Sequence, residues 1–590
     1  LQDEISSIRT TLEALQPARE AQSGSTDLPA TTCVKKGRKS GQNAAGGMEE
    51  GLNDYKDVQN KLKDILDKSV IKLLESLSKS NLPERRNAIE YLKNRLSGMK
   101  PDVVVDPIYI GVFGSTGAGK STLLNAIMDK NFFLPVSGSK ACTSCVVQVG
   151  TGLSRQYEAK IHLLTDEEWK EELKGLVALA EPDEDDDDYE RNEAVLKIST
   201  IYGEEAERKS YEDLCSMKPI VSIPSSRCVT IKATTGEDLS DKMNPYIRIQ
   251  SICSDANEGT SEEDRNTQLW PLVKNVEVTV PKMKVVPEGV VFMDIPGTGD
   301  VSSKRDAMWK ENINKCSVIW VVTSIERIQG QKTHEMMLKE AVKAFQGGMC
   351  RDISLVVTKS DQMDLNEYKW ERKKGDINKH DAILERNEMV KQEKGVMMKK
   401  NLEKKLPSDS EVLHKDDLVY TVSAWEYWNG DTLTKEETEV PKLREYIQKL
   451  YEAQKRNVLM DNVEELWVIF SLIQSIQSQQ DAQHLPVKRI LLQDFIEKFI
   501  CLGEDIEKYF EELEQPLHEG VAEAKRLCNE SIKKILKQVR DNRGFHKTLK
   551  AVCLNSGVYM SKIFGRIDIN RSLAQPIYDS IDMSFGNIFR

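Results

Sequence analysis

The sequence predicts an α/β domain with a mostly parallel sheet, flanked in the chain by all-helical segments. Three observations support this fold class. A glycine-rich loop at 114–121 joins an apolar strand pattern to a helical one. Strand patterns then alternate with helical patterns, which is typical of a parallel sheet. Apolar residues recur at helical spacing before this domain, at 51–79, and again from about residue 441 onward.

Composition limits the class of protein. The 590 residues exceed one ordinary domain, so we expect two to four units. The chain is 39% hydrophobic and 30% charged, which is typical of a soluble, helix-rich protein. A net charge of −12 argues against a broadly basic surface for nucleic acid. Eleven scattered cysteines favour a reducing compartment, and no apolar run approaches the ~20 residues of a membrane span.

Four regions are expected along the chain. Residues 1–50 read as an N-terminal helix and a flexible linker, and 51–100 as helices that pack with C-terminal helices. Residues 101–450 read as the phosphate-loop domain, with an insertion at about 151–285, and 451–590 as a helical bundle or stalk. The linker contains a basic run from Lys35 to Lys39, which fits either a nuclear-import patch or, more simply, a solvated linker.

Individual elements follow from local patterns. Thr165 to Glu168 is a capping box, so a helix should begin there and reach about Ala180. The acidic run 181–190 should be a solvated loop, and a charged helical stretch should fill 366–405. The expected strands are Tyr157–Leu164, Val276–Val280, Gly289–Met293, Val318–Thr323, Ile353–Val357 and Val419–Val422. A helical seam is expected at Leu459, Val463, Leu466, Phe470 and Ile473.

The glycine-rich loop has the spacing of a phosphate-binding loop. Its backbone N–H groups can wrap a β-phosphate, and the helix N-terminus adds positive potential. Lys120 should reach the β- and γ-phosphates, and the Ser121 hydroxyl should ligate Mg²⁺. The residues expected to contact phosphate are Gly114, Ser115, Thr116, Gly117, Ala118, Gly119, Lys120, Ser121 and Thr122.

Two further segments complete the predicted phosphate and metal site. Asp294 ends an apolar strand and can hold Mg²⁺ through water, while the Gly297 N–H can sense the γ-phosphate. Thr143 lies in the loop 135–145 and can complete the Mg²⁺ shell, although Ser144 or Ser139 could take that place. The expected metal ligands are therefore Ser121, Thr143 and Asp294, and the expected catalytic groups are Lys120, Thr143 and Gly297.

A third set of residues predicts which base is bound. Thr358, Lys359 and Asp361 follow an apolar strand in the order [NT]-K-x-D. A carboxylate at 361 can accept hydrogen bonds from both donors on the guanine edge, which adenine lacks. Ser423 and Ala424 follow the next strand and can place a backbone N–H against guanine O6. The expected ligands are GTP or GDP with Mg²⁺.

Cys142 and Cys145 form a Cys-x-x-Cys pair within the loop that carries Thr143. A redox pair or half of a zinc site would use such spacing. No second pair with metal-ligand spacing is visible in the sequence. A role in redox or zinc chemistry is therefore the weaker interpretation.

These motifs, in this order and with helices on both sides, resemble the G domains of the dynamin superfamily of large GTPases. The resemblance implies GTP hydrolysis, GTP-dependent pairing of G domains in a homodimer, and a helical bundle and stalk. Stretches between the motifs resemble a nuclear group within this superfamily more closely, which implies a nuclear location and a role in genome maintenance. These stretches include 133–138, 316–321 and 548–554.

The chain also departs from dynamins. Thr116 and Gly117 stand where dynamins carry a Gln and a Ser, and that Ser helps bind a charge-compensating monovalent cation. Thr298 stands where Ras-like GTPases place a water-orienting Gln, so slow intrinsic turnover is expected without a partner. The sequence leaves the source of a transition-state cation open among several arginines, including Arg155, Arg227 and Arg305.

Three functions remain compatible with the sequence. The leading hypothesis is a GTP-hydrolysing mechanochemical protein. The second is a nucleotide-gated scaffold with little intrinsic hydrolysis, motivated by the missing water-orienting residue. The third is a membrane-remodelling relative of dynamin, ranked last because no lipid-binding module, amphipathic basic helix or transmembrane hairpin stands out. No nucleic-acid module stands out either.

Overall fold

The computed structural model describes most of residues 106–297, 312–478 and 485–588, and short helical stretches before 106. Its gaps of three or more residues within these ranges are 135–144, 181–188, 248–267, 282–284, 329–331, 374–376, 404–410, 538–548, 554–556 and 562–564. The chain divides into two compact units. One contains residues 1–106 and 445–502, and the other contains 107–444 and 503–590.

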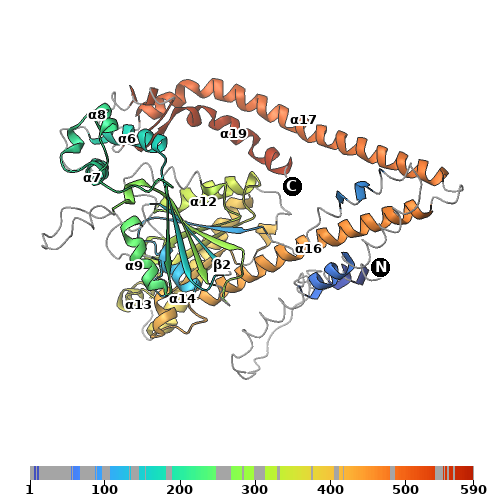
Figure 1. Cartoon of the computed structure of the whole chain (residues 1–590), viewed down its shortest axis with the longest axis horizontal. Coiled ribbons are helices and arrows are strands. Elements are labelled where there is room, and N and C mark those ends of the chain that lie inside the picture. The colour runs from blue at the N-terminus through green and yellow to red at the C-terminus, as the bar shows by residue number, and fades with distance from the viewer. Residues whose placement is uncertain are drawn as a thin grey trace. The chain divides into compact units, whose positions relative to one another are not determined.

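The second unit contains a nine-stranded sheet of described residues, in the order β4-β3-β5-β2-β6-β1-β7-β8-β9 (Figure 1). Strands β6, β1, β7, β8 and β9 run parallel to one another, and β2 is parallel to β5. This confirms the predicted α/β class with a mostly parallel sheet. The strands are β1 (Ile108–Gly114), β2 (Val146–Gly152), β3 (Tyr157–Leu163), β4 (Cys228–Ala233), β5 (Val273–Pro281), β6 (Val290–Asp294), β7 (Val318–Ser324), β8 (Asp352–Thr358) and β9 (Val419–Val422).

The central strands are buried along nearly their whole length and are mostly apolar, because helices cover both faces of the sheet. Every residue of β7 is buried, as are Ile353 to Thr358 of β8. One face packs against α12 (Lys332–Gln346) and α14 (Lys379–Glu403) in a shared hydrophobic cluster. The other face carries α5 (Lys120–Ile127), whose Leu123, Leu124 and Ile127 are buried.

The insertion expected at 151–285 extends the same sheet. Strand β3 pairs antiparallel with both β4 and β5, and β2 pairs antiparallel with β6. The helices of this segment are α6 (Asp166–Ala180), α7 (Tyr189–Tyr202), η2 (Ala206–Arg208), α8 (Tyr211–Ser216), α9 (Gly236–Ile247) and η3 (Trp270–Leu272).

Two expectations in this segment are resolved by the structure. The capping box is confirmed, because the Glu168 N–H donates to the Thr165 hydroxyl at 3.2 Å and the Thr165 N–H donates to the Glu168 carboxylate at 3.0 Å. The acidic run was expected to be a loop as far as residue 190, but Tyr189 and Glu190 begin α7. Residues 181–188 lie outside the described residues.

The helices between β7 and the chain end differ from prediction in two places. The charged stretch 366–405 forms two helices, α13 (Leu365–Arg372) and α14, because Lys373 turns left-handed at the end of α13. The C-terminal region is not helical throughout, since β10 (Val558–Ser561) and β11 (Gly565–Asp568) form an antiparallel pair. The remaining elements are η4 (Ile325–Arg327), η5 (Glu411–His414), α15 (Ala424–Asn429), α16 (Val440–Ser478), α17 (Leu485–Lys537) and α19 (Ile569–Ile588).

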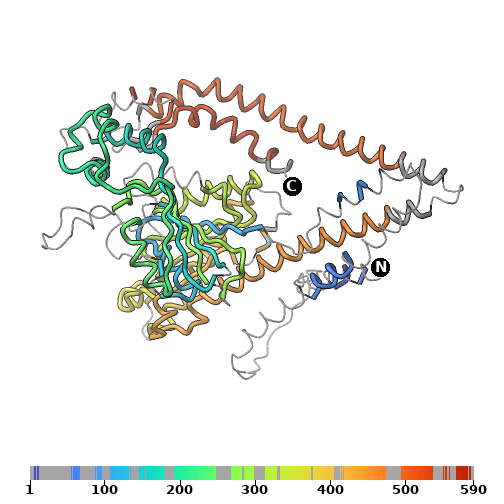
Figure 2. Tube along the Cα trace, in the orientation of Figure 1, coloured from blue at the N-terminus to red at the C-terminus, as the bar shows by residue number. Residues whose placement is uncertain are grey.

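Helices α17 and α19 pack together in the second unit, and their traces can be followed in Figure 1 and Figure 2. A side chain at Gly520 of α17 would meet the backbone of Ile577 at 2.8 Å, so glycine permits the close approach. The Ser580 hydroxyl donates to the Pro516 carbonyl oxygen at 2.7 Å. These contacts join the two helices through backbone as well as side-chain atoms.

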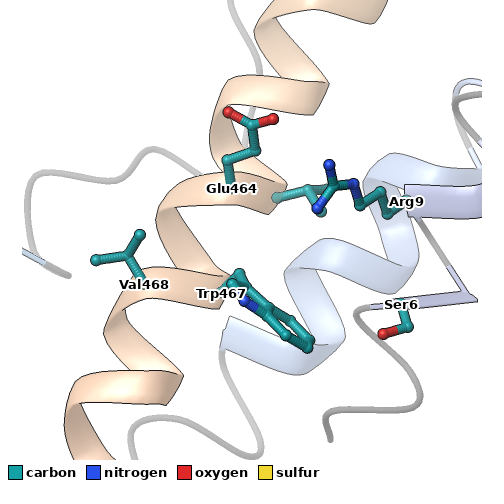
Figure 3. Close-up of a pocket in the computed structure, with 6 residues that line it drawn as sticks. Ser6, Arg9, Glu464, Trp467 and Val468 are labelled. Carbon is teal, nitrogen blue, oxygen red and sulfur yellow. The ribbon is translucent and has the colours of Figure 1, made fainter.

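The first unit is helical in its described residues. Leu459, Val463 and Leu466 of α16 are buried as the predicted seam requires, and Ile469 is also buried whereas Phe470 is half-exposed. Arg95 forms a two-pronged ion pair with Glu465 of the same helix. Ser6 and Arg9 line a small pocket with Val463, Glu464, Trp467 and Val468 of α16 (Figure 3).

Membrane-spanning helices need a long and continuous apolar stretch. None of the described helices combines the length and the apolar character that crossing a membrane requires.

Candidate functional site

The carboxyl ends of β1, β6, β8 and β9 meet at one edge of the sheet. Val112 of β1 is in register with Asp294 of β6, and Thr358 of β8 is in register with Val422 of β9. Every predicted site residue that the structure describes follows or ends one of these strands. In parallel α/β sheets this edge is where ligands bind, because the loops leaving the strands diverge there.

The loop after β1 has a shape that glycine makes possible. Gly117 and Gly119 have φ values of 75° and 85°, in the left-handed region that other residues adopt at a cost. A side chain at Gly114 would lie 2.3 Å from the Val322 carbonyl oxygen of β7. The loop therefore turns tightly and opens α5 at Lys120, with Gly119 as the residue before the helix.

The Lys120 side chain reaches back over this loop and contacts its backbone. This side chain is buried, and Nζ donates to the carbonyl oxygens of Gly114 at 3.1 Å and Ser115 at 3.2 Å. An ammonium group in this position lies within the curve of the loop. It can exchange these weak neutral acceptors for the oxygens of a phosphate chain.

Ser121 and Asp294 come together at the start of α5. The Ser121 hydroxyl donates to Asp294 Oδ2 at 2.5 Å. Asp294 is 2% exposed, and its Oδ1 atom has no hydrogen-bond partner among the described residues. Burial raises the pKa of the Asp294 carboxyl, while the Lys120 charge and the Ser121 hydrogen bond lower it. A buried carboxylate oxygen left without a donor, beside a hydroxyl, fits a hard cation such as Mg²⁺ or its water shell.

Gly297 packs directly on the phosphate loop. A side chain there would lie 2.5 Å from the Thr116 backbone nitrogen and 2.2 Å from its hydroxyl oxygen. Only glycine fits this contact, so the segment after β6 and the loop after β1 are in direct contact. A group bound against Thr116 would therefore also meet Gly297.

The loops after β8 and β9 bring the predicted base-binding residues together. The Thr358 hydroxyl donates to the Ala118 carbonyl oxygen at 2.5 Å, which joins this loop to the phosphate loop. The Ser423 hydroxyl donates to Asp361 Oδ1 at 2.5 Å and also caps α15 by accepting from the Glu426 N–H. The Asp361 carboxylate is thereby oriented by the next strand.

The two residues proposed to contact guanine O6 differ in whether the backbone N–H already has an acceptor. The Ser423 N–H donates to the Thr438 carbonyl oxygen at 3.2 Å. Ala424 is the first residue of α15, where an N–H has no acceptor within the helix. Ala424 is therefore the better placed of the two to donate to a base.

Arg386 of α14 supports the base loop, and sequence reasoning missed it. Its Nη2 donates to the Ser360 carbonyl oxygen at 2.6 Å, and Nη1 donates to that of Gln362. Burial lowers the pKa of Arg386, and the charge of Asp361 raises it. Arg386 is one charged residue within a long charged helix and belongs to no sequence motif. Its role could therefore not be recognised from the sequence.

Several predicted residues are placed elsewhere or lie outside the described residues. Thr143, Cys142, Thr298 and Arg305 are outside the described part of the chain, while Cys145 is buried. Arg155 is exposed in the turn between β2 and β3, at the opposite edge of the sheet. Arg227 forms an ion pair with Asp166 beside the edge strand β4. Neither of these two described arginines lies on the phosphate loop.

Comparison with known proteins agrees with this geometry. The Dynamin_N profile, described as the dynamin family, matches residues 110–359. A human protein named nuclear GTPase SLIP-GC is 47% identical over 556 residues, which cover 92% of this chain and 69% of that protein. The mouse protein of the same name is 46% identical over the same shares.

Solved structures of lower similarity were also found. One is described as "An oligomerised bacterial dynamin pair provides a mechanism for the long range sensing and tethering of membranes". It is 15% identical, the match covers 84% of this chain and 60% of that chain, and the TM-score is 0.38. From the identity to its relatives and the profile match, the chain belongs to the dynamin family of large GTPases, in the group of the nuclear GTPase SLIP-GC.

Proposed function

We propose that the edge formed by β1, β6, β8 and β9 binds GTP with Mg²⁺ and hydrolyses it to GDP and phosphate. The observation that carries the proposal is the juxtaposition of Lys120, the Ser121–Asp294 pair and the Ser423–Asp361 pair at that edge. The three groups have different chemistry. They match a phosphate chain, a hard cation and a guanine base, respectively.

The chain's own residues supply most of the proposed chemistry. Backbone N–H groups of the loop and the Lys120 ammonium hold the phosphate chain in place. Ser121 and Asp294 would hold Mg²⁺, which when bound neutralises charge on the phosphate oxygens. The Asp361 carboxylate would accept from the two guanine donors, oriented by Ser423. Thr143 and Gly297 are proposed to contact the metal and the γ-phosphate, respectively.

The pairing of G domains and the nuclear location belong to the same proposal. The relatives are named nuclear GTPases, which supports a nuclear role for this chain. No water-orienting glutamine follows Gly297, since residue 298 is a threonine. A second copy or another partner is therefore proposed to complete the site, and hydrolysis to be coupled to the helical region.

Base selectivity tests the proposal at Asp361. In Asp361→Asn the amide can accept only one hydrogen bond from guanine and turns a donor toward it, so GTP affinity should fall on the order of 10²-fold. The same amide donor suits the C2 oxygen of xanthine, so xanthosine triphosphate should bind more tightly than to wild type. Affinities are measured by competition against a fluorescent nucleotide.

Asp431→Asn is the matched control, because Asp431 is exposed and forms none of the hydrogen bonds described for the site. It should bind GTP as the wild type does. Equal binding of GTP and ATP by the wild-type chain would contradict the proposal, as would unchanged base preference in Asp361→Asn.

A further inference from the structure

Arg327 lies on the phosphate loop although it is distant from that loop in the sequence. Its Nη1 donates to the Thr116 carbonyl oxygen at 2.8 Å and lies 3.5 Å from the Ser115 hydroxyl oxygen. Its Nη2 lies 3.8 Å from the point where a Cβ of Gly117 would stand. The guanidinium therefore lies beside Gly117, a loop position that has no side chain of its own.

The fold holds this arginine in place. Arg327 ends the short helix η4, directly after β7, and β7 pairs with β1 so that Val322 is in register with Gly114. Ile325 and Ile328, on either side of Arg327, are buried in the hydrophobic cluster of the sheet. A guanidinium carried on a turn that is fixed at both ends needs little reorganisation to act on a bound ligand.

The charge of Arg327 is not neutralised within the described residues. None of the ion pairs found there involves Arg327, whereas Arg227 is paired with Asp166 and Arg444 lies 3.4 Å from Asp129. Its two hydrogen-bond partners are a carbonyl and a hydroxyl, both uncharged. A half-buried cation with neutral partners, next to a loop built for phosphates, favours an anion as its further ligand.

We propose that Arg327 supplies, from within the same chain, the cation that stabilises the transition state of GTP hydrolysis. This role rests on the function proposed above. In the reaction a water oxygen bonds to the γ-phosphorus, and the bond from that phosphorus to the β–γ bridging oxygen breaks. The electron pair stays on the GDP oxygen, and the proton of the water passes to the released phosphate. Negative charge grows on the bridging oxygen, and a guanidinium beside Gly117 offsets it.

The test uses the full chain and variants that separate charge from structure. Arg327→Gln keeps a donor for the Thr116 carbonyl but removes the charge, while Arg327→Lys keeps the charge without the fork. Arg372→Ala, at the exposed end of α13, is the matched control. Single-turnover GTP hydrolysis, GTP affinity and binding of GDP with aluminium fluoride are measured for each, in potassium chloride and in choline chloride.

In Arg327→Gln the hydrolysis rate should fall on the order of 10³-fold, as for other arginines that act on a transferred phosphoryl group. GTP affinity should change less than about 10-fold, and binding of GDP with aluminium fluoride should be lost. Added guanidinium chloride should restore part of the rate. The wild-type rate should be the same in potassium and in choline, because the cation is covalently attached.

Three results would overturn the role of Arg327 while leaving the proposed function intact. The first is that Arg327→Gln hydrolyses GTP as fast as the wild type. The second is that this variant loses GTP affinity and hydrolysis rate to the same extent. The third is that the wild-type protein stops hydrolysing GTP when choline replaces potassium. A wild-type rate no higher than that of Lys120→Ala would overturn the proposed hydrolysis itself, and the role of Arg327 with it. Melting temperatures of all variants identify any that fail to fold.

Discussion

At the scale of single residues, Asp294 carries the clearest conflict between stability and function. Its carboxylate is buried, one oxygen has a single donor in Ser121, and the other has no partner among the described residues. Burial raises its pKa, so the ionised form that metal binding needs is the form that the folded protein accommodates less well. Buried groups with a strongly shifted pKa cluster at functional sites.

Asp294→Asn should therefore stabilise the nucleotide-free protein while it weakens Mg²⁺-dependent nucleotide binding. Because the folded pKa of Asp294 is raised, its contribution to stability is present at low pH and is lost as the pH rises through that pKa. Asparagine does not ionise, so Asp294→Asn does not lose stability in this way. Its free energy of unfolding should therefore exceed that of the wild type by an amount that grows toward neutral pH, to the order of 1 kcal/mol. Thermal melting across pH measures this advantage.

The same melting experiment is repeated with Mg²⁺ and a non-hydrolysable GTP analogue. Mg²⁺ and the analogue together should stabilise the wild-type chain. They should stabilise Asp294→Asn much less, because the variant has lost a ligand for the cation. A nucleotide-free variant that melts below wild type at neutral pH would contradict the account of Asp294.

At the scale of elements, the site depends on residues that fix the ends of helices. Arg444 of α16 closes the C-terminus of α5. Its Nε donates to the Ile127 carbonyl oxygen at 2.9 Å, and Nη2 donates to the Ala126 carbonyl oxygen at 2.6 Å. The last carbonyls of a helix lack donors within it, although the Ala126 oxygen also accepts from the Asp129 N–H at 3.1 Å. A cation is also favoured at this end of the helix dipole. The helix that carries Lys120 and Ser121 is thus fixed at both ends.

Arg444→Ala should loosen α5 by about 1–3 kcal/mol, because two charged hydrogen bonds to buried carbonyls are lost. Hydrogen exchange of a peptide covering 120–128 measures this directly and should become faster. Arg444→Lys keeps the charge near the helix end but not the two-pronged contact. Its exchange rate should therefore lie between those of the wild type and Arg444→Ala. Unchanged exchange in Arg444→Ala would show that α5 does not depend on this contact.

The sequence predicted the elements that have local signals. The glycine loop, the capping box at Thr165 and the apolar strands β6, β7 and β8 each follow from a short pattern, and the structure has them within a residue or two. The pairing of β10 with β11 and the antiparallel place of β2 beside β6 were not predicted, because strand order is set by contacts distant in sequence. Arg327 and Arg386 were missed for the same reason, since only the fold brings them to the site.

At the scale of the whole molecule, the proposed function needs more than one chain or a partner. The described site contains Arg327 as a cation, but no residue is assigned to orient the attacking water. We therefore expect G domains to pair when GTP is bound. The GTP turnover per molecule should rise with protein concentration over the range in which dimers form, which light scattering with a GTP analogue can follow. A rate per molecule that is constant while dimers form would contradict completion of the site by pairing.

The measurement that tests the central claim most directly is phosphate release from GTP by the full chain, with Mg²⁺ and with Mg²⁺ chelated, beside Lys120→Ala. Lys120 is buried, and its ammonium group lies within the curve of the loop, on the carbonyl oxygens of Gly114 and Ser115. The account predicts steady release with Mg²⁺, a loss on the order of 10²-fold or more in Lys120→Ala, and little use of ATP. Release that persists in Lys120→Ala, or is absent from the wild-type chain at every protein concentration, would contradict it.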